Sequence, residues 1–371
     1  MARTPLRPDD PTRIGHYRLT ARLGSGGMGV VYLGVSWDGA PVAIKVLRPE
    51  LAGDQEFRHR FGREVAALVQ VKGVCTVRVI EADSQSSRPF VVTEYAPGPS
   101  LSEYIDKHGS VGPEMLFGLA TGLAEALTTI HAAGIMHRDL KPSNIILTDA
   151  GPKVIDFGIA RRQDTRGVTK TGMMIGSLGF MAPEQISGRP GPEADIFAWG
   201  VTVAYAAAGR SPFGAGNSHS ILYRVMYGDP DIASVPDSLH PLVEASLAKE
   251  PQSRPTAQQL LDRLTGSSRR PGQVNDTATT QVILARTWQS GSHPSVPSAA
   301  RSAAAPATEA PTADQAVPVL PRGAAPSAMA PAAVAPAPEK IPVGRRMATI
   351  ATSALVAMRL RRPSRREEPK R

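Results

Sequence analysis

The sequence predicts an α+β protein with a small antiparallel β lobe, a larger and mainly helical lobe, and a disordered C-terminal tail. Three features of the 371 residues support this order. Short β-branched runs fill residues 16–94, and helical periodicity dominates residues 101–264. After Gly266 the composition turns to Ala, Pro, Ser, Thr and Arg, with too few large apolar residues to build a core.

The first lobe is predicted to be mostly β-strands with one helix among them. Glycine turns separate several of the β-branched runs. Over residues 57–71, Phe57, Phe61 and Val65 recur at helical spacing with arginines between them, which predicts one amphipathic helix. The strands are expected at residues 17–23, 30–36, 41–47, 77–82 and 90–94.

The second lobe is predicted to be helical. Its longest periodic stretch runs from Glu114 to Ala132. Further helices are expected at residues 194–207, 220–226, 241–248 and 257–264.

The formal net charge of +9 suggests nucleic acid or an anionic membrane as a partner until its location is considered. From Thr265 onward about 15 Lys and Arg residues stand against about 6 Asp and Glu residues, so the tail carries the excess and the remainder is close to neutral. No aromatic residues interleave with the basic ones. Nucleic acid is therefore not an expected partner.

The chain has a single cysteine, Cys75, which excludes an intramolecular disulfide and a multi-thiolate metal site within one chain. Cys75 is expected to be a buried, inert side chain. Residues 1–15 contain charges and prolines but no apolar run, so they do not form a secretory signal. A cytoplasmic location is expected.

Residues 137–144 read His-Arg-Asp-Leu-Lys-Pro-Ser-Asn, and Asp156 follows at the distance of one short hairpin. Phosphoryl transfer needs a carboxylate that orients a hydroxyl group, a cation that neutralises phosphate charge, and oxygen ligands for magnesium. Asp139 and Lys141 supply the first two, and Asn144 and Asp156 supply the ligands. The spacing makes a chance loop improbable.

Residues 24–31 fit the pattern G-x-G-x-x-G-x-V. Alone this pattern is weak, because dinucleotide-binding proteins share its first six positions. A dinucleotide fold continues into a helix, whereas here Val30-Val31-Tyr32-Leu33 continues as a strand. The glycines are therefore expected in a hairpin turn that can approach phosphate oxygens closely.

Together with Val42-Ala43-Ile44-Lys45 and Asp156-Phe157-Gly158, these motifs resemble those of the protein kinases, most closely the eukaryotic-like Ser/Thr kinases of bacteria. The resemblance covers roughly residues 17–264 and implies the two-lobed protein-kinase fold. The implied organisation is a flexible N-terminus (1–15), a kinase domain (16–265) with N-lobe 16–95, hinge 94–98 and C-lobe 99–265, and a disordered tail (266–371).

The resemblance also implies a role for each site residue, with ATP and Mg²⁺ as cofactors and Ser/Thr proteins as substrates. Asp139 would act as base and Lys141 would offset γ-phosphate charge. Lys45 would hold the α- and β-phosphates, oriented by Glu64. Asn144 and Asp156 would bind magnesium. The ATP contacts would be Leu23, Gly24, Ser25, Gly26, Gly27, Met28, Gly29, Val30, Val31, Ala43, Lys45, Thr93, Glu94 and Ala96.

The positive charge of Arg138 is expected to need a neighbouring anion, which phosphorylation of Thr169 and Thr171 would supply. The alternative is that this loop stays unmodified. Ser177 replaces the threonine of most relatives and is expected to leave Ser/Thr specificity intact. Among the scaffold residues, the resemblance pairs Glu184 with Arg254 and makes Asp195 a brace of the catalytic loop, residues 137–144.

Two alternatives stay open at this stage. The chain could be a catalytically silent nucleotide-binding scaffold that presents its basic tail to partners. Residues 347–358, about 12 apolar residues between arginines, are too short to span a bilayer and read either as a solvated linker or as a peripheral anchor on anionic lipid at the inner face of the membrane. The tail is expected to be dispensable for catalysis, and a homodimer would serve trans-autophosphorylation.

Overall fold

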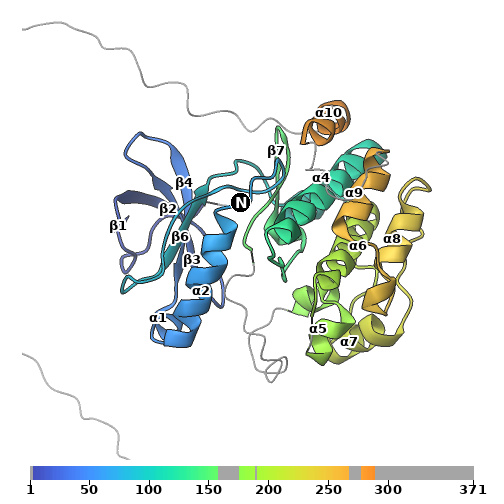
Figure 1. Cartoon of the computed structure of the whole chain (residues 1–371), viewed down its shortest axis with the longest axis horizontal. Coiled ribbons are helices and arrows are strands. Elements are labelled where there is room, and N and C mark those ends of the chain that lie inside the picture. Colours follow the sequence, from blue (N-terminus) through green and yellow to red (C-terminus); the bar gives the residue numbers. More distant parts are fainter. Residues whose placement is uncertain (1–2, 158–174, 189, 267–276, 289–371) are drawn as a thin grey trace, which may run out of the picture. The chain divides into compact units, whose positions relative to one another are not determined.

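The computed structural model describes residues 3–157, 175–188, 190–266 and 277–288 (Figure 1). Within this part of the chain, the first lobe is a six-stranded antiparallel sheet in the order β1-β2-β3-β4-β6-β5. Two helices accompany it. These elements are β1 (Arg13–Ile14), β2 (Tyr17–Ser25), β3 (Gly29–Val35), β4 (Pro41–Leu47), α1 (Pro49–Ala52), α2 (Gln55–Leu68), β5 (Val79–Asp83) and β6 (Phe90–Glu94).

The sheet has two differently covered faces because side chains alternate along each strand. On β4, Val42, Ile44 and Val46 are buried on one face, whereas Ala43 and Lys45 lie half-buried on the other. The apolar stripe of helix α2 shares a buried cluster with Val79 of β5 and Val91 of β6, and Figure 1 shows α2 alongside the sheet. Lys45 lines one cleft together with Ile146 of the second lobe, so the face that carries Lys45 is turned toward that lobe.

The second lobe contains one β-hairpin and helices. Its elements in chain order are α3 (Leu101–His108), α4 (Pro113–Ala132), η1 (Pro142–Asn144), β7 (Ile145–Thr148), β8 (Gly151–Val154), η2 (Ile175–Phe180), α5 (Pro183–Ser187), α6 (Glu193–Ala208), α7 (Ser218–Tyr227), α8 (His240–Ser246), η3 (Pro251–Ser253), α9 (Ala257–Thr265) and α10 (Thr277–Trp288), where η denotes a short 3-10 helix.

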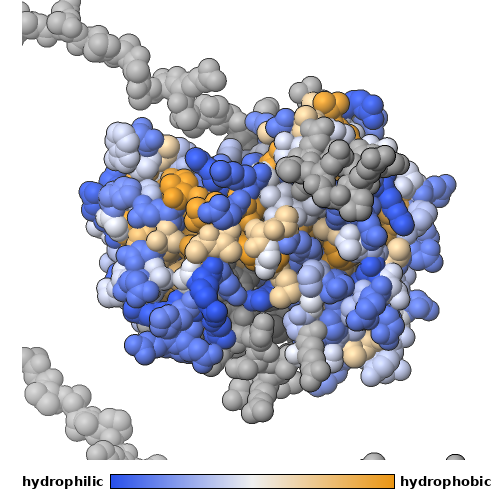
Figure 2. Space-filling view, in the orientation of Figure 1, coloured by the Kyte–Doolittle hydropathy of each residue, from blue (hydrophilic) through white to orange (hydrophobic). Residues whose placement is uncertain are grey.

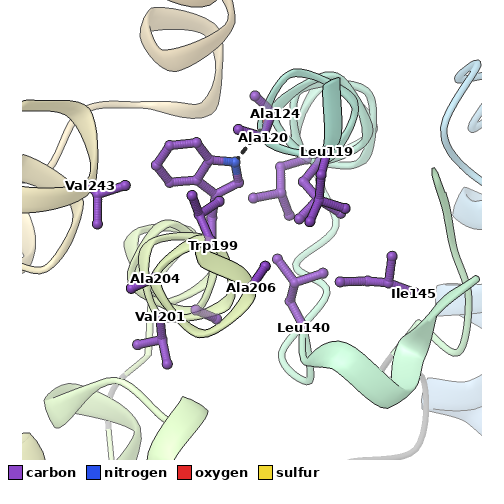
Figure 3. Packing of buried hydrophobic residues seen from close by; sticks show 14 of the residues in the cluster. Leu119, Ala120, Ala124, Leu140, Ile145, Trp199, Val201, Ala204, Ala206 and Val243 are labelled. Carbon is purple, nitrogen blue, oxygen red and sulfur yellow. Dashed lines mark hydrogen bonds between the residues drawn. The ribbon is translucent and has the colours of Figure 1, made fainter. Parts of the chain in front are cut away.

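Helices α4 and α6 form the centre of this lobe. Trp199 of α6 is fully buried, and its indole N–H donates to the carbonyl oxygen of Ala120 in α4 at 3.0 Å (Figure 3). Among the described residues, α4 is the one helix long and apolar enough to cross a bilayer, but 72% of that apolar stretch is buried inside the protein. Its apolar character is therefore that of a core helix.

The α+β fold class with a β lobe followed by a helical lobe is confirmed, and Cys75 is buried as expected. The hairpin β7–β8 occupies the predicted gap between the catalytic loop and Asp156. Helices α3 and α5 were not anticipated. Each is short, so periodicity gives little signal for it.

The expectation of a tail without structure from residue 266 is wrong for α10. Thr280, Leu284 and Trp288 recur at a spacing of four, are at most 4% exposed, and face α4 and the β7–β8 hairpin. The indole N–H of Trp288 donates to the carbonyl oxygen of Thr148 at 2.8 Å. This three-residue stripe was missed because the composition of the tail as a whole is polar. The apolar segment 347–358 lies outside the described residues.

The N-terminus also differs from the flexible segment that was expected. Residues 13 and 14 form β1, and Thr4 forms a β-bridge with Arg22 of β2. Leu6 packs against the buried cluster on the sheet face opposite α2. Residues 3–15 are therefore part of the folded N-lobe.

Candidate active site

The catalytic loop contains an uncommon backbone conformation. Among described residues other than glycine, Arg138 (φ 62°) and Asp156 (φ 57°) have positive φ, which is uncommon and concentrates at functional sites. The buried carboxylate of Asp195 in α6 stabilises the loop, since it accepts the backbone N–H groups of His137 at 2.8 Å and Arg138 at 2.7 Å. The expected bracing role of Asp195 is confirmed.

The side chains of the catalytic loop converge on one carboxylate. Lys141 Nζ lies 3.0 Å from Asp139 Oδ2, and the amide nitrogen of Asn144 donates to Asp139 O at 2.8 Å and to Oδ2 at 3.2 Å. Asp139 is about one-fifth exposed, which leaves it accessible to a substrate. A proton acceptor, a cation and an amide oxygen thus share one small volume.

His137 links this loop to the strand that leads to Asp156. Burial lowers the pKa of His137 below its ordinary value, so the ring is neutral at pH 7. Its Nδ1 accepts the N–H of Asp139 at 3.3 Å, and its Nε2 lies 3.2 Å from the carbonyl oxygen of Ile155. A neutral ring with its hydrogen on Nε2 satisfies both contacts.

The expected pairing of Lys45 with Glu64 is not the one found. Lys45 Nζ lies 3.0 Å from Asp156 Oδ1, and Glu64 Oε1 lies 3.0 Å from Arg138 Nη1. Burial raises the pKa of Glu64, and the Arg138 charge counteracts that rise. The structure brings together both cations and both carboxylates that the sequence singled out. Which cation Glu64 meets depends on how α2 sits against the catalytic loop, which residue spacing does not report.

An open cleft lies next to these residues. Leu23 and Val31 line it from the sheet, Ile146 lines it from the helical lobe, and Lys45 and Asp156 lie at its polar end. Its largely apolar walls with a few polar groups are typical of a small-molecule site. On the face shown in Figure 2, hydrophilic side chains dominate and hydrophobic ones gather toward the middle.

The predicted hinge residues also reach the cleft. Thr93, Glu94 and Ala96 line it, and Thr93 lies opposite Ala43 in the β4–β6 register. Glu94 additionally forms an ion pair with Lys153 at 3.3 Å. Sequence reasoning missed other lining residues, among them Tyr95 and Phe157. Both lie within segments that the sequence identified, the hinge 94–98 and the motif Asp156-Phe157-Gly158, and this position was the available signal.

The glycine-rich stretch forms the predicted hairpin turn between β2 and β3. The N–H of Gly26 donates to the carbonyl oxygen of Gly29 at 2.9 Å. A Cβ at Gly29 would lie 2.0 Å from the carbonyl oxygen of Val46, so packing explains that glycine. Gly24, Gly26 and Gly27 have nothing within 4 Å of a Cβ. Their missing side chains leave space in which a ligand can approach the backbone.

The donors near the cleft fit a divalent cation that is bound together with phosphate. Asn144 and Asp156 offer oxygen atoms, and the described residues contain no group of three or more His, Cys, Asp or Glu side chains that could hold a metal alone. Mg²⁺ typically takes one or two carboxylates and completes its shell with water and substrate phosphates. This set therefore suits a cation that arrives with a nucleotide.

The predicted scaffold pair is also present. Arg254 donates to both carboxylate oxygens of Glu184, at 2.6 and 3.0 Å, and its side chain is fully buried. Ser177 lies in η2, whereas Gly158, Thr169 and Thr171 lie outside the described residues.

The chain is similar in sequence to known protein kinases. The protein kinase domain family matches residues 17–264. The chain is 45% identical over 288 residues to the probable serine/threonine-protein kinase PkwA of Thermomonospora curvata, which covers 76% of this chain and 39% of that protein. It is 42% identical over 261 residues to the serine/threonine-protein kinase AfsK of Streptomyces coelicolor, covering 70% and 33%.

The chain therefore spans about two-fifths of PkwA and one-third of AfsK. Among solved structures, the kinase domain of Mycobacterium tuberculosis PknI is similar in fold, with a TM-score of 0.54 and 24% identity, covering 69% of this chain and 97% of that one. The resemblance to bacterial Ser/Thr kinases is confirmed at the level of sequence family and fold.

Proposed function

Because the chain belongs to the protein kinase family, we propose that it is an ATP-dependent protein Ser/Thr kinase that transfers the γ-phosphoryl group of Mg-ATP to a protein hydroxyl group. The observation that carries this proposal is the placement of two residue pairs. Lys45 lies 3.0 Å from Asp156 in the cleft, and in the adjoining loop Asn144 donates to Asp139 at 2.8 and 3.2 Å. The N–H of Ile155 joins the two segments by donating to the carbonyl oxygen of Asn144 at 2.9 Å. A silent scaffold would not need this complete set.

Asp139 orients the substrate hydroxyl group and accepts its proton as the oxygen attacks the γ-phosphorus. The new O–P bond forms while the bond from the γ-phosphorus to the bridging oxygen breaks, and ADP leaves with the electron pair. Lys141, 3.0 Å from Asp139, offsets the negative charge that spreads over the transferred group. A lysine at this position supports Ser/Thr rather than Tyr specificity.

Lys45 holds the α- and β-phosphates, and the glycine-rich turn covers them with its backbone. Asn144 and Asp156 are the residues that would hold Mg²⁺, which when bound offsets charge on the β- and γ-phosphate oxygens. Thr93, Glu94 and Ala96 would contact the adenine, chiefly through the backbone of the last two. Glu64 forms an ion pair with Lys45 after its ion pair with Arg138 is broken.

Activation follows from the ion pair between Arg138 and Glu64. A phosphate on Thr169 or Thr171 carries about −1.5 to −2 charges and competes with Glu64 for Arg138. Once its ion pair with Arg138 is broken, Glu64 can form an ion pair with Lys45. Lys45 then no longer pairs with Asp156, and the Asp156 carboxylate is available to bind the metal. Autophosphorylation between two copies of the chain would start this change.

The tail governs location rather than catalysis in this proposal. Residues 347–358 and their flanking arginines would associate weakly with anionic lipid at the cytoplasmic face of a membrane. Nothing about the cleft depends on that association.

Transfer from ATP labelled at the γ-phosphate tests the proposal. Full-length protein with Mg²⁺ should label itself and a generic basic protein, and acid hydrolysis should yield phosphoserine or phosphothreonine without phosphotyrosine. Mass spectrometry should locate phosphate on Thr169 or Thr171. Nucleotide binding without any transfer would favour the scaffold instead, and phosphotyrosine would contradict the role of Lys141.

A further inference from the structure

The N-terminal segment, residues 3–10, is bound to the strand that enters the glycine-rich turn. Thr4 and Arg22 exchange two backbone hydrogen bonds, of 3.0 and 2.8 Å, along the edge of β2 that β3 does not use. Leu6 adds an apolar contact to the sheet. The segment thus attaches to β2 one residue before Leu23, where the predicted nucleotide contacts begin.

Asp10 is the main polar anchor of this segment. Its carboxylate is 3% exposed and accepts Arg22 Nε at 2.6 Å, Arg22 Nη2 at 2.5 Å, the Tyr32 hydroxyl at 2.8 Å and the N–H of Arg7 at 2.7 Å. The Arg22 hydrogen bonds hold the pKa of Asp10 well below its usual range, and burial together with Asp10 raises the pKa of Tyr32 to about 12. Asp10 is therefore charged and Tyr32 protonated at any assay pH near neutrality.

The two side chains that Asp10 joins belong to adjacent strands. Arg22 pairs with Tyr32 in the β2–β3 register, so Asp10 ties the two strands of this hairpin together. Arg22 directly precedes Leu23, and Tyr32 directly follows Val31. Leu23 and Val31 both line the nucleotide cleft, and because side chains alternate along a strand, Asp10 holds the hairpin from the face opposite that cleft.

A second anchor reaches the hinge. Arg3 Nη2 lies 3.1 Å from the hydroxyl oxygen of Tyr95, and its guanidinium carbon lies 5.3 Å from the centre of the Tyr95 ring. Tyr95 lines the same cleft. The segment therefore bridges two walls of the cleft, the glycine-rich hairpin and the hinge.

We propose that the N-terminal segment positions the glycine-rich hairpin for nucleotide binding, with Asp10 as the main positioning residue and Arg3 as a second contact at the hinge. The proposal rests on the proposed ATP site. A segment that fixes both walls of an open cleft lowers the conformational cost of closing it on a ligand. Its loss should raise the KM for ATP while leaving kcat and the KM for protein substrate nearly unchanged.

Asp10→Asn in the full-length chain tests this, because it keeps the side-chain shape and removes the charge. We expect the KM for ATP and the Kd of a fluorescent ADP analogue each to rise about three- to tenfold, since Arg22 loses a charged partner. The matched control is Asp9→Asn, an exposed neighbour, which should leave both constants within about twofold of wild type.

Tyr32→Phe is the second variant, and keeps the test decisive if Asp10→Asn does not fold. It removes one hydrogen bond to Asp10, retains the buried ring, and should raise both constants in the same direction by a smaller factor. Unchanged nucleotide constants in a folded variant would overturn the proposal, even if its melting temperature fell, and so would equal effects from Asp9→Asn. A wild-type chain that binds no nucleotide would overturn the proposed function itself, which is a distinguishable result.

Discussion

Helix α10 should stabilise the kinase domain, although it lies beyond the residues that match the kinase family. Leu284 and Trp288 are buried to 2% and 4% exposure against α4 and the β7–β8 hairpin. Truncating a buried Leu to Ala costs about 2–5 kcal/mol, and truncating a buried Trp about 3–5 kcal/mol. Trp288→Ala also removes the hydrogen bond to the Thr148 carbonyl.

These losses have an upper limit, because α10 can detach while the rest of the domain stays folded. A chain that ends at residue 268 measures that limit. We expect its free energy of unfolding, from urea titration, to fall by about 2–5 kcal/mol, and Trp288→Ala in the full-length chain to lose no more than this. A chain ending at residue 290 should match wild type. Val282→Ala, on the exposed face of α10, should change stability by less than about 0.5 kcal/mol.

Gly118→Ala gives the sharpest form of the test because its effect should change sign. In the full-length chain the new Cβ would lie 2.5 Å from Thr287 Oγ1 and 3.3 Å from the Trp288 ring, so these side chains or α10 must shift and stability should fall. In the chain ending at residue 268 that clash is gone, and Ala should stabilise α4 by about 0.5–1 kcal/mol relative to Gly. Equal unfolding midpoints for the chains ending at 268 and 290 would refute the docking role of α10.

Three further predictions concern the site and the tail. Lys45→Met should lower the transfer rate at least about 100-fold, and Glu64→Ala should lower it by a smaller factor. If the double variant lost, in steady-state assays, the product of the two single-variant factors, the two residues would not act as a pair. Because burial depresses the pKa of His137, the folded chain binds fewer protons than the unfolded one, so stability should fall as pH drops below about 6.5. Urea titrations at pH 5.5 and 7.5 should show this loss, and a smaller loss in His137→Gln. Full-length protein should pellet with anionic vesicles at low salt through residues 347–358 and release as salt rises, whereas equal pelleting of the chain ending at 290 would exclude that segment as an anchor.

The sequence predicted the two lobes and the members of the site because phosphoryl transfer requires specific residue types at short spacings. The loop from His137 to Asn144 is held by its own hydrogen bonds and by Asp195, so its residues, which are close in the sequence, are also close in the structure. The glycine-rich turn is equally local.

The partners that Lys45 and Glu64 have in the structure, Asp156 and Arg138, could not be predicted, since these contacts involve a strand, a helix and a loop that are far apart in the chain. Two cations and two carboxylates of similar geometry admit more than one pairing, and small movements of α2 decide among them.

The ordered N-terminal segment and α10 escaped prediction for a different reason. Asp10 reads as a surface residue until Arg22 and Tyr32 surround it, and Trp288 is the last residue of a short stripe in a polar region. Both depend on partners that local composition does not reveal.

The most direct test of the proposed chemistry compares Asp139→Asn with Asp149→Asn. Asp149 is an exposed residue in the turn between β7 and β8, so Asp149→Asn provides a matched loss of one carboxylate. In purified, folded protein, Asp139→Asn should lower kcat by about 10²- to 10⁴-fold while the Kd for nucleotide stays within about twofold of wild type; Asp149→Asn should leave both unchanged. A kcat for Asp139→Asn close to that of wild type would contradict the assignment of Asp139 as the base and, with it, the mechanism proposed for this cleft.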